Sequence, residues 1–329
     1  MPHEPNHLDG TWLLLPHFPL WIVSASGYLA SALVLTTFCM GSMRPLRLTA
    51  VASNLAFIFY AAVADIPPVL ILHSILLPVN IFRLVQIQRA IVTARRLLDE
   101  PDSAASYEGL GDPHFLSRAA VADAGAALQL AEREQERVVR LLAAMLPSEA
   151  ASTFGIAPEA ATMAAQRLLD EIDRYLAAVI PGNPSVEQLA QMATLHSCND
   201  VLRALHEALQ ELAQLVGQAQ AGRSAEIAVA VSEGLATLLL HADDAAHTRA
   251  PDDIHLLLRT TGDRSELVER IRQSSIAGSI SGAADDYRAI YAITRLYERT
   301  VWLLHRYGAL LDNRPIAMHD NNAGKNASV

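Results

Sequence analysis

The chain has 329 residues, 51% of them hydrophobic, and a formal net charge of −10 at pH 7. Residues 101–329 hold 19 basic and 30 acidic side chains, whereas the first hundred hold 6 and 5. So acidic a chain excludes nucleic acid as a partner, because the phosphate backbone requires a basic face. Its two cysteines, Cys39 and Cys198, exclude a disulfide framework.

Three apolar runs occupy residues 21–40, 48–64 and 67–85. Each is close to the ~20 residues that an α-helix needs to cross ~30 Å of hydrocarbon. Residues 1–20 hold no Lys or Arg, so they lack the positive region that begins a signal peptide. The sequence therefore predicts an extracytoplasmic leader over residues 1–20 and a three-span membrane domain over residues 21–88.

Arginines give the orientation of these spans. Six of them lie in the loop after the first run and at or beyond the end of the third: Arg44, Arg47, Arg83, Arg89, Arg95 and Arg96. The leader and the loop 65–68 have no basic residue. Since basic loops stay on the cytoplasmic side, we expect the N-terminus outside and the chain beyond residue 89 in the cytoplasm. Lys325 is the only lysine, which favours a bacterium with a GC-rich genome, and hence a bacterial inner membrane.

Polar residues of the third run share one helical face. His73, Asn80 and Arg83 are seven and three residues apart. Such side chains face a bundle interior or an aqueous cavity, so one interpretation is a solute or proton path. In the favoured alternative, His73 and Asn80 bond neighbouring spans, Pro78 kinks the helix and Arg83 reaches the inner interface.

The membrane region resembles a known family. The residues that carry the likeness are Gly27-Tyr28-Leu29-Ala30, Thr37-Phe38-Cys39-Met40, Pro45-Leu46-Arg47-Leu48, Ser53-Asn54, Pro67-Pro68-Val69-Leu70, His73, Leu77-Pro78-Val79-Asn80 and Arg83-Leu84. They resemble the three-span region of Popeye-like bacterial membrane proteins, which often precedes a cyclic-nucleotide-binding domain. More distantly, the region is similar to half-transporters that pair to carry small solutes. No Gly-rich β-roll follows here, so we expect a different domain in its place.

Residues 89–115 are expected to form a connecting helix and a linker, the linker over 102–114 being rich in Ser, Gly, Asp and Pro. Beyond it, apolar residues recur at helical spacing. The pattern predicts helices over 128–145, 161–179, 186–216, 224–246, 252–260, 265–274 and 283–311, and a disordered tail over 312–329. No stretch demands a strand, and none after residue 116 has ~18 uninterrupted apolar residues. The fold class is therefore all-α, with a helical bundle over residues 116–311.

Side-chain positions within the bundle also follow from spacing. Ser185 precedes Val186-Glu187-Gln188 and is predicted to cap the next helix, with Gln188 as its partner. Glu132, Arg133, Glu136 and Arg137 are expected to cover the solvated side of their helix. Trp302 has apolar neighbours at Tyr297, Val301 and Leu304, and we expect it in or near the core.

Two parts of the bundle resemble a second family. The first is Asp170-Glu171-Ile172-Asp173-Arg174-Tyr175-Leu176 with Ser185-Val186-Glu187 and Asn199-Asp200-Val201-Leu202-Arg203. The second is Thr261-Gly262-Asp263-Arg264-Ser265 with Glu269-Arg270-Ile271-Arg272 and the segment from Ile293-Thr294-Arg295 through Glu298-Arg299 to Trp302-Leu303-Leu304. Both are similar to PhoU-like helical domains, in particular the cytoplasmic tail of bacterial sodium–phosphate cotransporters. The resemblance implies two three-helix repeats.

The second resemblance also implies a metal, which that family binds through an acid-rich pattern near a Glu-Arg pair. This chain departs from the pattern: Leu202 precedes Arg203, and His206 stands where the second acid is expected. In the second half Glu298 and Arg299 are kept, but Trp302 replaces the acid. Sites that each lack an acid are poor carboxylate clusters for a hard or iron-type cation.

A residual polar cluster remains as a candidate metal or anion site. His196, Asp200, Arg203 and His206 recur with Asn199 at spacings of three and four, and the preceding helix carries Asp170 and Asp173. The alternative is that this stripe is the solvated face of a bundle helix. The run His241, Asp243, Asp244 and His247 is open to the same two interpretations.

Three functions stay open. The favoured one is a non-enzymatic regulator or adaptor, in which a membrane-anchored PhoU-like bundle acts on a phosphate transporter or sensor protein. The second is a small-solute carrier built by oligomerisation of the three-span block. The third, an enzyme, has no nucleophile–base constellation, phosphate loop or zinc motif to support it. The expected partners are the lipid bilayer and a second copy of the chain, since Gly27, Ser31, Ala50, Ser53 and Ala56 allow close helix approach.

Overall fold

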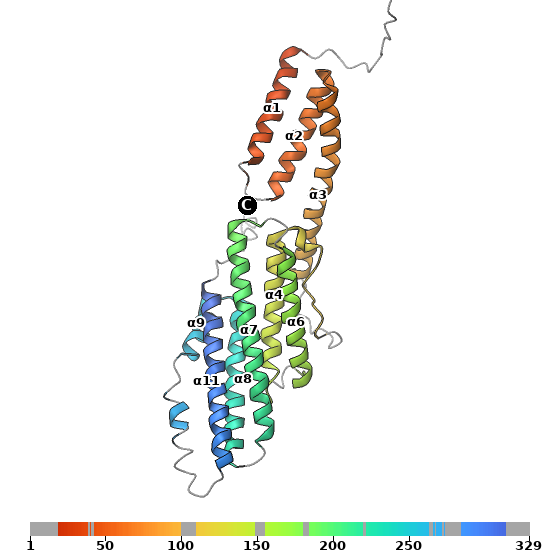
Figure 1. Ribbon diagram of the computed structural model, residues 1–329. Helices are drawn as coiled ribbons and strands as arrows, with labels where there is room; N and C mark the ends of the chain where they lie inside the picture. The colour runs from red at the N-terminus through yellow and green to blue at the C-terminus, as the bar shows by residue number, and fades with distance from the viewer. Residues whose placement is uncertain are drawn as a thin grey trace, which may run out of the picture. The chain divides into compact units, whose positions relative to one another are not determined.

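The computed structural model describes residues 19–38, 40, 43–99, 110–148, 155–179, 184–219, 222–262, 266, 268–271, 273 and 284–313. Every regular element among them is helical, as predicted (Figure 1). The chain divides into two compact units, Met1–Arg89 and Ala90–Val329. The expected leader lies outside the described residues except at Pro19 and Leu20, and the expected tail except at Asp312 and Asn313.

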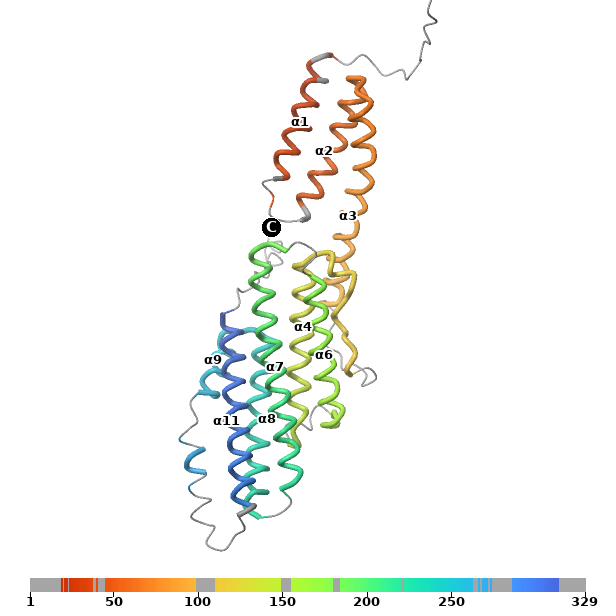
Figure 2. The backbone as a smooth tube through the Cα atoms, in the orientation of Figure 1, coloured from red at the N-terminus to blue at the C-terminus, as the bar shows by residue number. Residues whose placement is uncertain are grey.

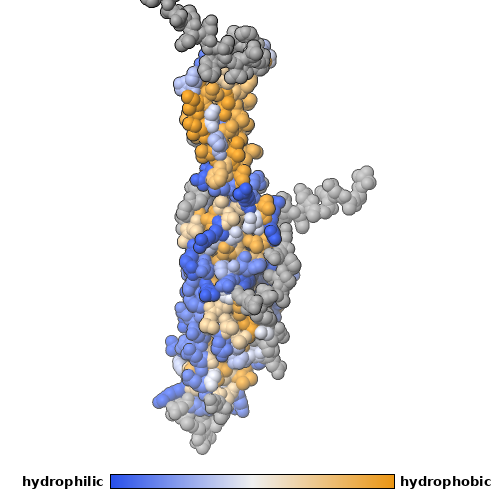
Figure 3. Space-filling model, turned by 90° about the vertical axis from the view of Figure 1, so that its right-hand side faces the viewer, coloured by the Kyte–Doolittle hydropathy of each residue, from blue (hydrophilic) through white to orange (hydrophobic). Residues whose placement is uncertain are grey.

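The first unit holds α1 (Leu20–Phe38), α2 (Met43–Val63) and the larger part of α3 (Pro67–Asp99). Its large apolar side chains point outward: Trp21 is 71% exposed and Phe82 62%. Figure 3 shows hydrophobic side chains over most of the visible surface of these helices. Exposed apolar surface on this scale requires an apolar environment. Pro45–Val63 and Pro67–Leu98 are long and apolar enough to cross a membrane, and α1 has no charged residue in its 19 positions.

Helices α1 and α2 pack closely because small residues meet between them. Ala30 and Ser53 are buried, and the Ser53 hydroxyl donates to the Ala30 carbonyl oxygen at 3.4 Å. A Cβ on Gly27 would lie 3.1 Å from the Tyr60 ring, so a side chain there would push the helices apart. Gly27 and Ser53, which were expected to allow close approach of another copy, thus serve the contact between α1 and α2 of one chain.

The second unit is a helical bundle. Its elements after the end of α3 are η1 (Ala120–Ala122), α4 (Ala124–Ala143), α6 (Pro158–Val179), α7 (Val186–Gln218), α8 (Arg223–Thr248), α9 (Pro251–Thr260) and α11 (Ala284–Asp312). The long helices lie along one another (Figures 1 and 2) and enclose one apolar core that includes Leu142, Leu168, Leu202 and Leu304. The predicted cap of α7 is confirmed: the Gln188 backbone N–H donates to Ser185 Oγ at 3.2 Å, and the Ser185 N–H donates to Gln188 Oε1 at 2.9 Å.

Helix α8 is the third element long and apolar enough to span a membrane, which the sequence pattern did not predict. Glu226 and Glu233 interrupt its apolar residues, but its mean hydropathy still reaches 1.4. The helix packs against α4, α9 and α11, and residues such as Leu235 and Leu239 are fully buried. Burial on several sides accounts for this composition, since a helix that is apolar nearly all round belongs in a core or in a membrane.

The described parts of the segment 89–115 pack with the second unit. Ala94 of α3 packs with Phe115, Ala120 and Leu130, all within the second unit. Residues 110–115 are described and lie against α4, while 101–109 lie outside the described residues. The connecting helix and the end of the expected linker therefore belong to the bundle.

Candidate functional site

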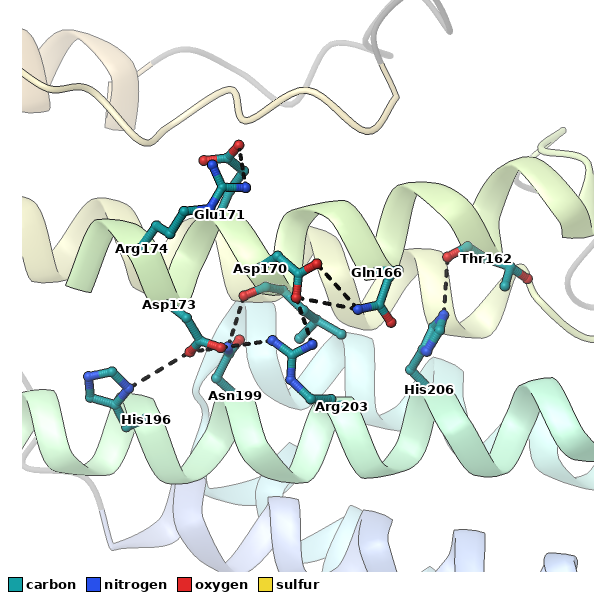
Figure 4. A network of polar contacts seen from close by, with 11 residues as sticks. Thr162, Gln166, Asp170, Glu171, Asp173, Arg174, His196, Asn199, Arg203 and His206 are labelled. Atoms are coloured by element: carbon teal, nitrogen blue, oxygen red, sulfur yellow. Dashed lines mark hydrogen bonds and ion pairs between the residues drawn. The ribbon is translucent and has the colours of Figure 1, made fainter. Parts of the chain in front are cut away.

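The polar residues predicted on α6 and α7 meet in one network (Figure 4). Arg203 of α7 lies between two carboxylates of α6: its Nη1 donates to Asp170 Oδ1 and its Nη2 to Asp173 Oδ2, both at 2.8 Å. The Asn199 amide donates to Asp173 Oδ1 at 2.6 Å and to the Leu169 carbonyl oxygen at 3.1 Å. The network therefore holds the two helices together.

Pairing of the charges in this network shifts the pKa values of Asp170 and Arg203. Burial alone would raise the pKa of the Asp170 carboxyl, but hydrogen bonds from Arg203 and Gln166 outweigh it and lower the pKa. Burial likewise opposes the charged guanidinium of Arg203, yet the bonds to Asp170 and Asp173 raise its pKa. Each ion thus favours the charged form of its partner, the mark of a structural ion pair.

The other predicted members lie at the edges of this network. His196 Nδ1 is 3.8 Å from Asp173 Oδ1, too far for a hydrogen bond. His206 is buried, its Nε2 is 3.1 Å from the Thr162 carbonyl oxygen, and burial lowers its pKa. Asp200 points to solvent and takes no part in these contacts. The prediction that the six residues form one cluster is wrong for Asp200.

The arrangement does not fit a divalent metal. The Arg203 guanidinium occupies the position between Asp170 and Asp173 that a cation would need. In the part of the chain that the structure describes, no three His, Cys, Asp or Glu side chains come together in a way that could hold a metal ion. Leu202, which precedes Arg203, carries no ligand atom, and its side chain is fully buried in the core.

The second motif residues lie on α11. Glu298 is half-buried and Arg299 is exposed. Trp302 is 57% exposed, so the prediction that it lies in the core is wrong. The Arg306 guanidinium lies over its indole ring, with Cζ 5.6 Å from the ring centroid, and makes a cation–π contact at the surface. These residues form part of an outward face of α11.

In the first unit, two of the three predicted polar residues bond α2. His73 Nδ1 is 2.9 Å from Asn54 Oδ1, and its ring stacks on Phe57 with centroids 4.4 Å apart. Arg47 Nη1 donates to Asn80 Oδ1 at 3.2 Å. Arg83 Nη1 donates to Gln86 Oε1 at 3.4 Å, one turn further along α3, and bonds no other described residue. This is the geometry expected of polar groups that join neighbouring spans.

A second charged cluster lies on α4 and was not predicted from the sequence. Of the expected solvated side of α4, Glu136 is buried, with 8% of its area exposed, and Glu132, Arg133 and Arg137 are half-buried. Their neighbour Glu134 has no exposed area. Glu134 Oε2 accepts the backbone N–H groups of His114 at 3.0 Å and Phe115 at 2.7 Å, and its other oxygen pairs with Arg137. Burial raises the pKa of Glu134, with Arg137 and the two N–H groups opposing the shift.

Glu136 faces α8 and the residues after it. It pairs with Arg133 and lies 3.7 Å from Arg249 Nη2 and 3.8 Å from His247 Nδ1. Burial raises the pKa of the Glu136 carboxyl to about 7 despite the two arginines. One turn away, Arg140 Nε donates to Asp243 Oδ2 at 3.4 Å, so Asp243 and His247 of the second sequence run hold α8 to α4.

The sequence did contain a signal for this cluster. Five of the six positions 132–137 are charged, and successive helix positions turn by about 100°. Such a run covers the whole circumference of the helix, so some of its charges must face neighbouring elements.

Comparisons with protein-family models, curated proteins and solved structures find no match to this chain.

We predict that Arg203→Met lowers the free energy of unfolding by about 1–2 kcal/mol, because two adjacent carboxylates lose their partner. The triple variant Asp170→Asn/Asp173→Asn/Arg203→Met should recover part of this loss, since it leaves no unpaired charge. Denaturant unfolding of the full chain in detergent measures both. Arg174→Met, on an exposed arginine of α6, is the control and should change little. Equal losses in the three variants would contradict a structural role for the pair.

A second prediction follows from the raised pKa of Glu136. Between pH 4.5 and about 7, this carboxyl is ionised in the unfolded chain but protonated in the folded one. Rising pH therefore removes stability across this window. Glu136→Gln abolishes that contribution, so relative to the parent it should gain about 1–3 kcal/mol between pH 5 and pH 7.5.

Denaturant unfolding at both pH values makes this measurement. Glu159→Gln is the matched control, because Glu159 is exposed in the first turn of α6. Parallel pH profiles for Glu136→Gln and the parent chain would refute the assignment.

Proposed function

We propose that this chain is a membrane-anchored, non-enzymatic regulator or adaptor, whose helical bundle acts by docking to another protein. The observation that carries the proposal is that charged side chains of the second unit pair with neighbouring helices. Glu134, Glu136, Asp243 and the Asp170–Asp173 pair are engaged in contacts that join one helix or segment of the bundle to the next. Charges used in this way build a scaffold rather than a reaction centre.

The pocket geometry agrees with this proposal. A pocket of ≈ 430 Å³ lies along α9, lined by Asp252, His255, Leu258 and Arg259. These side chains come from a single short helix. A catalytic site requires a nucleophile or a general base positioned by a third group. His255 could serve as a base, but its Nε2 lies 3.9 Å from Asp312 Oδ1, beyond hydrogen-bond range.

We propose that α1, α2 and α3 are the anchor. Their apolar side chains are exposed and α3 continues beyond the hydrocarbon-length segment to Asp99. The basic residues that favour a cytoplasmic end of α3 are Arg89, Arg95 and Arg96. A bacterial inner membrane, with the N-terminus outside and the bundle inside, follows from this distribution.

The link to phosphate rests on resemblance. We infer a PhoU-like bundle of two three-helix repeats from the motifs around Asp170–Asp173 and Glu298–Arg299, and hence a phosphate transporter or sensor protein as partner. The order α4, α6, α7 and then α8, α9, α11 is compatible with two repeats. In this chain an arginine–carboxylate pair stands at the first motif where the relatives hold metal.

The second candidate is a small-solute carrier formed by several copies of the three-span block. The observation that favours it is the polar line Arg47–Asn80 and Asn54–His73 between α2 and α3. In Asn54 the Nδ2 atom is buried without a partner. Intramembrane polar groups mark transport paths in many carriers, but here they are bonded to each other.

Orientation is tested by cysteine labelling. In a Cys39→Ser/Cys198→Ser background, a cysteine at position 6 should react with an impermeant thiol reagent in intact cells, whereas one at position 323 should react only after lysis. Both positions, and Cys39, lie outside the described residues. Labelling at 323 without lysis would invert the orientation and remove the cytoplasmic regulator.

Function is tested in a strain that lacks the chain, by uptake of labelled phosphate under limiting and ample supply. The full chain should restore the parental response, and Arg83→Leu should do so too, since among the described residues Arg83 bonds only Gln86 of its own helix. Residues 1–89 alone should insert but fail to restore it. A membrane block that suffices, together with an indispensable Arg83, would make the chain a carrier. An uptake response unaffected by loss of the chain would refute the phosphate link.

A further inference from the structure

Two neighbouring helices of the bundle carry outward stripes of opposite charge. Along α7 the exposed side chains include Asp200, Glu207 and Glu211 and no arginine, and we call these three the acidic stripe. Along α11 they include Arg295, Arg299 and Arg306, the basic stripe. Within each stripe neighbouring residues are four or seven positions apart and the outer two are eleven apart, so each stripe occupies one side of its helix.

These stripes adjoin because α7 and α11 pack side by side (Figures 1 and 2). The two helices run in opposite directions: the Ser224 N–H at the start of α8 donates to Asp286 Oδ1 at the start of α11, at 3.1 Å. Since α8 begins shortly after α7 ends, the start of α11 lies beside the end of α7. Counted from that shared end, Arg295 and Glu207 are each eleven residues along, so they lie at about the same height.

The stripes do not neutralise each other within one copy. No hydrogen bond or ion pair with another described residue engages the carboxylates of the acidic stripe. The same holds for the guanidinium groups of Arg295 and Arg299, while Arg306 lies over Trp302. Trp302 sits within the basic stripe and is 57% exposed. Tryptophan and arginine are the side chains that most often dominate the energetics of protein interfaces.

We propose that α7 and α11 form a two-fold interface with a second copy of this chain, in which the acidic stripe of each copy lies on the basic stripe of the other. A two-fold axis parallel to the helices places α7 opposite the partner copy's α11 and leaves each residue at its height, so that Arg295 of one copy lies level with Glu207 of the other. Two-fold symmetry makes both contacts at once, since an isologous interface uses the same face twice.

Charge and area both favour a second copy as the occupant. An acidic protein or an anionic lipid surface would meet the acidic stripe beside the basic one, whereas this face is complementary to itself. Two chains of net charge −10 repel overall, so they approach best where charges alternate. Helix α11 has 29 residues and is about 44 Å long. With helix axes about 9 Å apart, α7 and α11 together form a face about 18 Å wide, whose area is roughly 800 Å². This matches the ~800 Å² per partner of a standard interface.

The test is a charge swap on the full chain in detergent. One variant reverses the basic stripe (Arg295→Glu/Arg299→Glu/Arg306→Glu), and another reverses the acidic stripe (Asp200→Arg/Glu207→Arg/Glu211→Arg). Neither should self-associate, because each then carries two stripes of one sign. Mixed together with different tags, they should co-purify as a heterodimer, because both contacts are again attractive. Arg167→Glu/Arg174→Glu, on exposed arginines of α6, is the control and should associate as the parent does.

Association that is equal in every combination would overturn the proposal, since the copies would then be held elsewhere, for instance by their spans. Failure of the mixture to associate while each variant keeps its helical circular dichroism would overturn it too. Trp302→Ala tests the same face without altering charge: it should weaken self-association about 30-fold and leave unfolding of the monomer nearly unchanged. An unchanged association constant would refute the interface. None of these outcomes depends on the proposed function in phosphate control.

Discussion

The bundle depends on pairing the carboxylates that α4 carries into the interior. Glu134 has no exposed area, and an unpaired buried carboxylate would cost several kcal/mol. It is compensated by Arg137 and by the backbone N–H groups of His114 and Phe115, which fixes the segment before η1 against α4. Phe115 in turn packs with Ala94, so the last turns of α3 join the bundle. The buried charge of Glu134 thereby fixes residues 114 and 115 beside α4.

The two units distribute their apolar and polar side chains in opposite ways. In the first, α1–α3 expose residues such as Phe82 and Trp21 and place polar groups between helices, where Asn54 bonds His73 and Arg47 bonds Asn80. This inside-out distribution suits a lipid environment, because polar groups in hydrocarbon must find partners within the protein. In the second unit the apolar side chains are inside and surface charge is abundant. Hydropathy alone does not separate the two, since α8 is as long and nearly as apolar as a span; only its burial does.

Local rules predicted what depends on local chemistry. The helices of the second unit follow from apolar spacing, and the cap of α7 follows from Ser185 and Gln188. Placement of individual side chains required knowing which helices meet. Trp302 was expected in or near the core because Tyr297, Val301 and Leu304 are apolar, but these lie five, one and two positions away, and each helix position turns by about 100°. Its true neighbours on the helix surface are Glu298, Arg299, His305 and Arg306, which are all polar and indicate an outward face. Partners of Glu136, such as Arg249, lie more than a hundred residues away, beyond any local pattern.

Attachment to a membrane would let an interface of moderate affinity hold copies of the chain together. If copies share a bilayer, their bundles are confined near one plane, and the effective concentration of one for another rises as it does for tethered modules. A polar interface such as the paired stripes of α7 and α11 is weakened by salt and competes with water, so in free solution it would be modest. Under confinement the same contacts suffice, and assembly then depends on how many copies the membrane holds. If the chain is the adaptor proposed above, its abundance sets the number of docking faces that it presents.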